Sequence, residues 1–242
     1  MSEQKELMFF MWNRNWRRGL EWYKRHFVGD AQIYGEASTG YTSYPAHLGV
    51  PARIHSVVPD VKLIYLVRDP IDRILADYVQ QFSDANEDRP LSEVLADLDG
   101  NPISPRSKYY TQIGQYLPYF PKRQLLVIDQ RNLWDRRIKT LREVFQFLEV
   151  DATFVSPKFS NVKNRTANKR RKGSAARFLK RLAESEPINR IVAPDTRRQL
   201  GSVVYSLTSA PIEKPVLDDV LRARLVKYLK DDIDRFRAFC GR

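Results

Sequence analysis

The feature that most constrains the fold is the stretch from Val61 to Arg73, where a short apolar run leads directly into a helix. Residues 63–67 (LIYLV) are apolar, β-branched or aromatic, a pattern typical of a strand covered on both faces of a parallel sheet. Pro70 then stands where a helix accepts proline, and Asp69 is the expected N-cap. The stretch therefore predicts a buried strand followed at once by a helix.

Arg68 lies between this strand and this helix, at the carboxyl end of the strand. Open α/β sheets bind their ligands at such strand ends, which makes Arg68 a candidate binding residue. The strand alone equally allows Arg68 to be paired with a nearby carboxylate. Behind Pro70, apolar residues recur at helical spacing and predict one buried face, formed by Ile71, Ile74, Leu75, Tyr78, Val79 and Phe82.

Further segments alternate between strand and helix patterns. Strands are expected at residues 32–36 and 124–129, and helices at residues 16–23, 51–58, 91–98, 109–117 and 138–148. This alternation predicts an α/β fold with a parallel sheet, right-handed crossovers and flanking helices. The 242 residues suit one sizeable domain, and no linker divides them, so residues 1–242 are expected to form a single domain.

Charge and cysteine content bound the partners and the compartment. The 41 Lys and Arg residues outnumber the 29 Asp and Glu residues, giving a net charge of +12, so anionic partners are expected. These partners include a phosphorylated cofactor, a sulfated or phosphorylated substrate, and nucleic acid. Cys240 is the single cysteine, which suits a reducing, cytoplasmic compartment. The sequence contains no apolar run of about eighteen residues, so no transmembrane segment is predicted.

Several motifs along the chain stand in an order found in one enzyme family. In the first third of the chain they are Lys5-Glu6 with Phe9-Phe10, residues 16–23, Gly35-Glu36-Ala37-Ser38, and residues 66–70 with Arg73 and Tyr78. Further along they are Tyr109 with Leu117, Phe120-Pro121 with residues 124–127, Phe147-Leu148, and the C-terminal Leu225-X-X-Tyr228-X-X-Asp231. By these motifs the chain resembles sulfotransferases, in the branch with bacterial sulfotransferases and heparan sulfate N- and O-sulfotransferases. The resemblance implies a nucleotide-kinase-like fold in a bacterial protein. It also implies metal-free transfer of a sulfuryl group from 3′-phosphoadenosine-5′-phosphosulfate (PAPS) to a hydroxyl or amine.

The resemblance also implies a catalytic base. In the resembling enzymes the glutamate of a Glu-X-Ser segment takes the acceptor's proton, and here that position is Glu36, with Ser38 and Tyr41 beside the acceptor. Burial near apolar residues would raise the pKa of Glu36 toward a value useful for a base. Without the resemblance, Glu36 reads as a solvent-exposed glutamate at a strand end. His47 and His55 are the alternative bases, although each also suits a surface or packing role.

For the 3′-phosphate of PAPS, the resemblance implies an arginine and a serine eight positions later. Arg68 fits, but Ala76 occupies the serine position. One charge-assisted hydrogen bond contributes about 1.5–3 kcal/mol, so its absence would weaken nucleotide binding roughly ten- to a hundredfold. Arg73 is retained as a second cofactor-binding candidate, although Asp77, one helical turn later, is an alternative partner for it.

A basic run, residues 168–174, resembles the family's Arg/Lys-Gly loop that closes over the same phosphate. Its matching residues are Arg171, Lys172 and Gly173. Taken alone, such a run is usually a solvated loop. The surrounding residues 165–181 would also suit nucleic acid, but they hold no aromatic residue except Phe178, so nucleic acid is disfavoured as a partner.

One expected part of the family pattern is absent from the sequence. A strand, a Gly/Lys/Thr-rich loop and a helix that hold the 5′-phosphosulfate are expected before Lys5, and no G-X-X-X-X-G-K-[ST] motif occurs. That strand is expected to lie between those ending at Glu36 and Arg68, so its absence predicts an open sheet edge and self-association. The alternative function is a non-catalytic protein that binds anions or nucleic acid. The acceptor class stays open among glycan, lipid, small molecule and peptide.

Overall fold

The structure is a computed structural model that describes residues 1–84, 86–161, 170–171, 210–212 and 215–241. Its elements, in chain order, are η1 (Trp16–Arg18), α1 (Leu20–Lys24), η2 (Thr39–Thr42), α2 (Val50–Val57), β1 (Leu63–Val67), α3 (Pro70–Ser83), α4 (Leu91–Val94), η3 (Pro105–Ser107), α5 (Tyr109–Gly114), η4 (Lys122–Gln124), β2 (Leu125–Asp129), α6 (Gln130–Asp135), α7 (Arg137–Leu148), η5 (Pro157–Ser160), β3 (Arg170–Arg171), β4 (Ala210–Pro211) and α11 (Asp219–Phe239).

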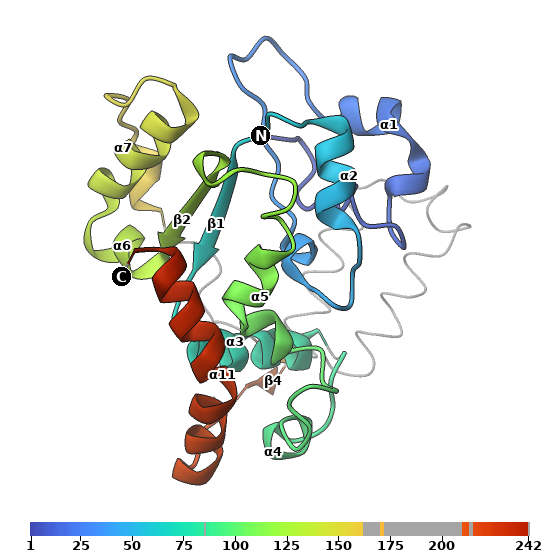
Figure 1. The fold of residues 1–242 in the computed structure, drawn as a ribbon, viewed down its shortest axis with the longest axis vertical. Coiled ribbons are helices and arrows are strands. Elements are labelled where there is room, and N and C mark those ends of the chain that lie inside the picture. The colour runs from blue at the N-terminus through green and yellow to red at the C-terminus, as the bar shows by residue number, and fades with distance from the viewer. Residues whose placement is uncertain (85, 162–169, 172–209, 213–214, 242) are drawn as a thin grey trace.

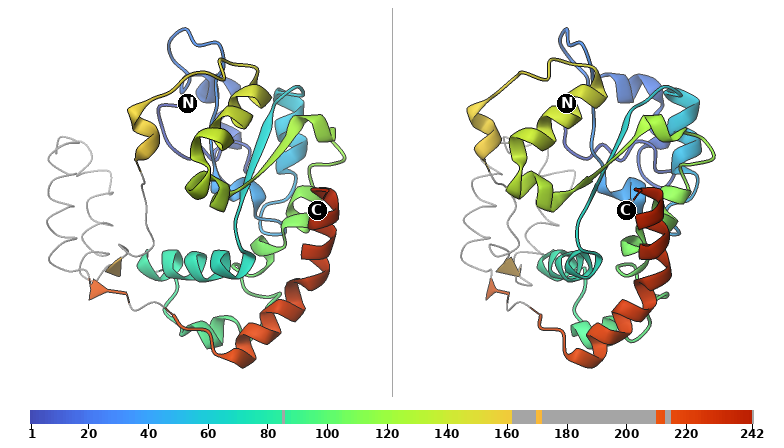
Figure 2. Two further views of the ribbon diagram at one scale, coloured as in Figure 1. Left: turned by 90° about the vertical axis from the view of Figure 1, so that its left-hand side faces the viewer. Right: turned by 60° about the vertical axis from the view of Figure 1, so that its left-hand side comes forward.

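A parallel pair of strands, β1 and β2, lies at the centre of the fold (Figure 1). Its register runs from Leu63 opposite Leu125 to Val67 opposite Asp129. In the views of Figures 1 and 2, this sheet lies between α6 and α7 on one side and α2 on the other. These features confirm the predicted α/β class with a parallel sheet and flanking helices. Within the described part of the chain, β1 pairs only with β2.

The predicted strand-to-helix unit is confirmed. Asp69 caps α3, because its Oδ1 atom accepts the backbone N–H groups of Ile71 at 2.9 Å and Asp72 at 3.0 Å. The apolar face of α3 packs into a core that also contains Leu225 and Leu229 of α11, both fully buried. This packing holds α3 next to the carboxyl end of β1, as Figure 1 shows.

A second core joins the N-terminal segment to α2 and to the start of β1. Phe9 and Phe10 are buried in it with Val50 and Ile54 of α2, and the Phe9 ring stacks on Tyr23 of α1 at 4.3 Å. The helix predicted at residues 16–23 is divided into η1 and α1 by Gly19, whose φ of 81° interrupts the helical backbone. No helix among the described residues is long and apolar enough to cross a membrane.

The strand predicted at residues 32–36 is wrong. The backbone from 33 to 38 belongs to no strand, and Ile33 and Tyr34 are 41% and 48% exposed. The Tyr34 hydroxyl donates to the carbonyl of Gly29, so this segment closes on its own loop. A β-branched and aromatic sequence forms a strand only when another strand offers hydrogen bonds and packing, and no described strand pairs with this one.

The helices predicted at residues 91–98 and 109–117 are shorter than expected, ending at Val94 and Gly114. In both places tight turns follow the helix, with Ala96 N–H donating to the Glu93 carbonyl at 3.2 Å and Tyr116 N–H donating to the Ile113 carbonyl at 2.8 Å. Side chains spaced at three and four residues continue through such turns, so the apolar pattern outlasts the helix itself.

Candidate functional site

The carboxyl ends of β1 and β2 open onto a cavity of about 1110 Å³. Arg68, the first residue after β1, lines this cavity together with Ala76 of α3. The Asp69 cap brings the two residues to one wall, because it fixes the turn between β1 and α3. Pockets for small molecules commonly measure about 300–1,000 Å³, so the cavity has room for a ligand of nucleotide size.

The cavity combines an apolar floor with charged groups of both signs. Side chains of the sheet and of α11 form the apolar part, which includes Val67, Leu125, Val127, Ile233, Phe236 and Phe239. Basic residues on its walls are Arg68, Lys122, Arg131 and Arg237, and acidic residues are Asp69, Asp72, Asp129 and Asp135. Trp134 of α6, which is 52% exposed, adds an indole ring to the lining. Such a wall could contact both an aromatic base and charged groups of a ligand.

Arg68 is held by its backbone rather than by an ion pair. Its N–H group donates to the hydroxyl of Tyr109 at 3.4 Å, and the Tyr109 ring packs between Tyr65 at 5.8 Å and Phe236 at 5.5 Å. Partial burial lowers the pKa of the Arg68 guanidinium. No ion pair of Arg68 exists among the described residues. The cofactor-binding role of Arg68 stays a prediction.

Arg73 has a different environment. Its Nη1 atom lies 3.6 Å from Asp77 Oδ2 and donates to the Ser107 hydroxyl at 3.3 Å. It is absent from the residues that line the cavity. The ion pair with Asp77 is the alternative that helical spacing indicated, and the cofactor-binding role of Arg73 stays a prediction.

Arg106 joins the same ion-pair group and was missed in the sequence. Its Nη1 atom lies 3.3 Å from Asp77 Oδ2, so two guanidinium groups share one carboxylate oxygen. The Nε atom of Arg106 is buried and has no hydrogen-bond partner among the described residues. No local pattern could have revealed this residue, because 29 positions separate it from Asp77.

Glu36, Ser38 and Tyr41 lie together against the N-terminal segment. The Tyr41 hydroxyl donates to Glu36 Oε1, and the Ser38 hydroxyl accepts the backbone N–H of Met8 at 2.9 Å. The backbone N–H of Phe10 donates to the Tyr41 hydroxyl at 3.3 Å. The structure therefore brings together the three residues predicted for the base and the acceptor, although not at a strand end.

The carboxyl group of Glu36 is electrostatically unusual. Burial raises its pKa above the ordinary value, while the hydrogen bond from Tyr41 acts in the opposite direction. The Oε2 atom is buried and has no hydrogen-bond partner among the described residues. The pKa of the Tyr23 phenol in α1 is also raised, first by burial and then by the charge of Glu36. A partly buried carboxyl group with a raised pKa is the type of group that general bases use.

The structure does not bring Glu36 and Arg68 into one cavity. Glu36 is absent from the lining of the large cavity, which Arg68 does line. The two sites are joined through α5 and the turn after it, because Tyr109 contacts Arg68 and the Tyr116 hydroxyl donates to the carbonyl of Tyr41 at 2.8 Å. Because no strand ends at Glu36, the prediction that Glu36 and Arg68 both lie at strand ends on one sheet edge is wrong.

A second carboxylate, that of Glu6, adjoins the Glu36 segment. The hydroxyl of Thr39 donates to Glu6 Oε2 at 3.3 Å. Glu6 has a left-handed backbone with φ of 55°, which is uncommon outside glycine and is found disproportionately near functional sites. In the sequence, Glu6 belongs to the family motif Lys5-Glu6, but no function was predicted for it.

The two histidines weighed as alternative bases pack elsewhere. The His55 ring lies 5.5 Å from Phe120 and 6.0 Å from Tyr119, as a packing histidine would. The pKa of His47 is lowered, first by burial and then by the charges of Arg106 and Arg14. No hydrogen bond joins either ring to Glu36 among the described residues.

Of the basic run at residues 168–174, the structure describes only positions 170 and 171. Arg171 lies in β3, where only its backbone is described, and Lys172 and Gly173 lie outside the described residues. The carbonyl of Arg170 accepts a hydrogen bond from Ser83 at 2.8 Å, which places this backbone at the C-terminal end of α3. Among the described residues there is no group of three or more side chains that could hold a metal ion.

Comparison with known proteins gives consistent matches. The family model of the sulfotransferase domain matches residues 2–199. Human heparan sulfate glucosamine 3-O-sulfotransferase 5 is 31% identical over 163 residues, covering 62% of this chain and 46% of that protein. The bifunctional heparan sulfate N-deacetylase/N-sulfotransferase of Drosophila melanogaster is 27% identical over 176 residues, covering 60% of this chain and 16% of that protein. The chain thus spans less than half the length of these relatives.

A solved structure agrees with these matches. The crystal structure of a sulfotransferase from Alicyclobacillus acidocaldarius superposes with a TM-score of 0.67 at 21% identity, covering 100% of this chain and 85% of that one. The fold is therefore of the sulfotransferase type. Since the family model covers more than half of the sequence, this chain belongs to the sulfotransferase family, whose members are transferases. The resemblance drawn from the motifs is confirmed, and the non-catalytic alternative is not favoured.

Proposed function

We propose that this protein transfers a sulfuryl group from PAPS to a hydroxyl or amine group of a glycan. Membership of the sulfotransferase family supports the transfer. The glycan acceptor is supported by the names of the relatives, which are heparan sulfate sulfotransferases. PAPS as the donor, and the residues assigned below, are carried by the chemistry of the site.

The observation that carries the donor assignment is Arg68 in the wall of the large cavity, a cation that has no ion-pair partner among the described residues. A partly buried guanidinium without a carboxylate partner is costly, and a phosphate group would offset that cost with charge-assisted hydrogen bonds. The 3′-phosphate of PAPS is such a group. Ala76, on the same wall, cannot donate the further hydrogen bond that a serine would supply.

Sulfuryl transfer needs a group that takes the acceptor's proton. As the acceptor oxygen bonds to sulfur and the bond from sulfur to the phosphate oxygen breaks, the acceptor proton moves to a base, for which we assign Glu36. Its raised pKa brings the carboxylate closer to the pH at which general bases are most effective. Its Oε2 atom is buried and has no protein donor among the described residues, and we assign this oxygen to take the acceptor proton. Ser38 lies two residues away and is assigned to the acceptor.

Donor binding is tested by calorimetric titration with 3′-phosphoadenosine-5′-phosphate. Arg68→Ala should weaken binding about ten- to a hundredfold, because it removes charge-assisted contacts to phosphate. Arg222→Ala is the matched control, since Arg222 is an exposed arginine of α11 that does not line the cavity. Equal affinity of Arg68→Ala and wild type would remove Arg68 from the donor site.

The base is tested by transfer of labelled sulfate from PAPS to heparan sulfate. Glu36→Gln should lower turnover by about 10²–10⁴ with nucleotide affinity unchanged, because it keeps the shape of the side chain and removes the base. Glu6→Gln is the parallel variant, since Glu6 is the carboxylate next to this segment. Loss of turnover in Glu6→Gln with retention in Glu36→Gln would transfer the role to Glu6.

A further inference from the structure

Tyr41 is held in place by contacts of both its ring and its backbone. Its ring packs edge-on against the Phe10 ring at 5.7 Å, and its carbonyl accepts the hydroxyl of buried Tyr116 at 2.8 Å. Gly40 allows close approach of the preceding backbone, because a Cβ atom there would lie 2.6 Å from the sulfur of Met11. A residue whose ring is packed and whose backbone is held loses little further entropy when its hydroxyl makes one more hydrogen bond.

The hydrogen bonds of Tyr41 give its hydroxyl a definite direction. The backbone N–H of Phe10 donates to the phenol oxygen at 3.3 Å, so that oxygen acts there as an acceptor. The phenol has a single proton, and this proton is donated to Glu36 Oε1. The hydroxyl is thus committed to the carboxylate rather than free to contact an acceptor. One oxygen of Glu36 is engaged, and Oε2 has no partner among the described residues.

We propose that Tyr41 is a positioning residue for Glu36, which holds Oε1 so that Oε2 takes the proton of the acceptor. This inference rests on the proposed function, in which Glu36 is the base. In the step, the acceptor oxygen forms a bond to sulfur, the departing 3′-phosphoadenosine-5′-phosphate keeps the electron pair of the broken bond, and the acceptor proton passes to Oε2. Tyr41 keeps its own proton throughout.

This arrangement has a consequence for the ionisation of Glu36. The titratable groups that face it are Tyr41 from η2 and Tyr23 from α1, while Glu6 reaches the same segment through Thr39. A hydrogen bond donated to a carboxylate stabilises its charged form, whereas burial favours the neutral form. Loss of the Tyr41 hydroxyl should therefore raise the pKa of Glu36 beyond the value that burial already sets.

The experiment compares Tyr41→Phe with wild type in the full chain without ligand. The carboxyl ¹³C signals of labelled glutamate are titrated by NMR, and the Glu36 signal is assigned by its absence from Glu36→Gln. Glu36 should titrate at higher pH in Tyr41→Phe. Tyr78→Phe, which removes a buried tyrosine hydroxyl that donates to the carbonyl of Arg89, should leave the Glu36 titration unchanged.

Kinetics supply the second readout. Tyr41→Phe should lower kcat about tenfold near neutral pH, as expected for loss of one hydrogen bond to a charged group. The acid limb of kcat should move to higher pH, and KM for PAPS should be unchanged. A role confined to packing would shift neither the acid limb nor the Glu36 titration.

Two results would overturn the inference, and they are distinct. If Glu36→Gln is inactive but Tyr41→Phe matches wild type in titration and kcat, Tyr41 does not position the base, and Glu36 remains the base. If Glu36→Gln is fully active, the proposed base fails and this inference fails with it. Should Tyr41→Phe not fold, 3-fluorotyrosine at position 41 replaces it. This phenol is a stronger donor, so Glu36 should then titrate at lower pH, and an unchanged or higher pH would contradict the inference.

Discussion

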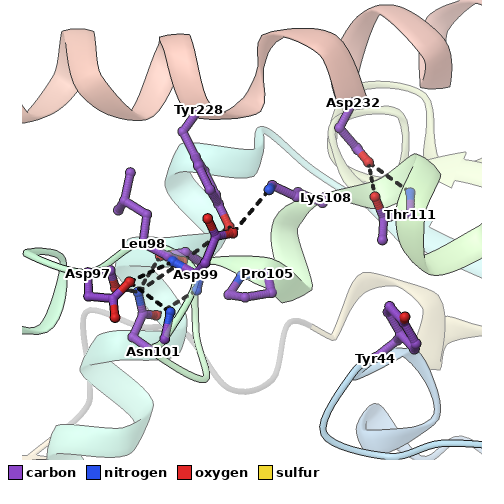
Figure 3. Close-up of polar contacts among 12 residues, drawn as sticks. Tyr44, Asp97, Leu98, Asp99, Asn101, Pro105, Lys108, Thr111, Tyr228 and Asp232 are labelled. Atoms are coloured by element: carbon purple, nitrogen blue, oxygen red, sulfur yellow. Dashed lines mark hydrogen bonds and ion pairs between the residues drawn. The ribbon is translucent and has the colours of Figure 1, made fainter.

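The carboxylate of Asp232 on α11 caps the first turn of α5 at Thr111, 121 positions earlier in the chain (Figure 3). Its Oδ2 atom accepts the backbone N–H of Thr111 at 2.8 Å and the Thr111 hydroxyl at 2.7 Å, and its Oδ1 atom accepts the N–H of Tyr110 at 2.9 Å. The same helix begins with Tyr109, whose hydroxyl contacts the backbone of Arg68. The C-terminal helix therefore braces the helix whose Tyr109 contacts Arg68.

Asp232→Ala should lower the free energy of unfolding by about 3 kcal/mol, because it leaves the partly buried backbone N–H groups of Tyr110 and Thr111 without an acceptor. Asp232→Asn keeps one acceptor oxygen, so its free energy of unfolding should fall by less than that of Asp232→Ala. Asp234→Ala is the control, since it removes only an exposed ion pair with Lys230 and should change stability by about 0.5 kcal/mol or less. Urea unfolding measures the three variants, and equal losses in Asp232→Ala and Asp234→Ala would show that the cap is not stabilising.

Ala76→Ser should tighten binding of 3′-phosphoadenosine-5′-phosphate by about tenfold, because it adds a hydroxyl donor to the wall that carries Arg68. The effect should disappear in the Arg68→Ala background, where the phosphate is no longer held beside it. Calorimetric titration of the two single variants and the double variant checks this coupling. Unchanged affinity in Ala76→Ser would mean that the 3′-phosphate does not reach this part of α3.

Glu36→Gln should raise thermal stability at neutral and alkaline pH while it removes activity. The pKa of Glu36 is raised by burial in the folded state, so its contribution to stability is greatest when the carboxyl group is protonated. That contribution is lost as the pH rises through the folded-state pKa, and glutamine avoids the loss.

Melting temperatures measured from acid to alkaline pH test this expectation. The difference between Glu36→Gln and wild type should grow as the pH rises. Glu143→Gln, at an exposed position of α7, serves as the control and should show no such trend. A stability gain that is independent of pH would place its origin outside the ionisation of Glu36.

The unpaired edge of β1 and the exposed face beside it should promote self-association at high protein concentration. Within the described residues β1 pairs only with β2, and its side chains Ile64 and Leu66 are 42% and 50% exposed on one face. Leu66→Lys places a charge on that face and should keep the protein monomeric. Leu48→Lys, which changes an exposed leucine outside the sheet, should leave the association unchanged. Sedimentation velocity over a range of concentrations decides, and a monomeric wild type at every concentration would contradict the expectation.

The unit around Arg68 could be predicted because its determinants are local. The apolar run that forms β1, the cap at Asp69 and the helical spacing in α3 all lie within about twenty consecutive residues. Each is encoded by hydrogen bonds and side-chain periods that neighbouring residues complete among themselves. The position of Arg68 at a strand end followed from the same local order.

Tertiary contacts decided the environment of Glu36. A strand at residues 32–36 needed a partner strand, which no local pattern supplies, and the described structure gives it none. The hydrogen bonds of Tyr41 with Phe10 and of Ser38 with Met8 join positions 31 and 30 residues apart, so they could not be read from spacing. The burial that raises the pKa of Glu36 depends on the same contacts.

The sequence by itself determined the α/β class, the strand-to-helix unit that carries Arg68 and the family motifs, because these depend on residue type, order and short-range period. Only the tertiary structure decided that Arg68 has no described carboxylate partner, that Arg73 and Arg106 share Asp77, and that Asp232 caps α5. The physical reason is that charge pairing and desolvation depend on distances between side chains far apart in the chain, which close only when the core packs.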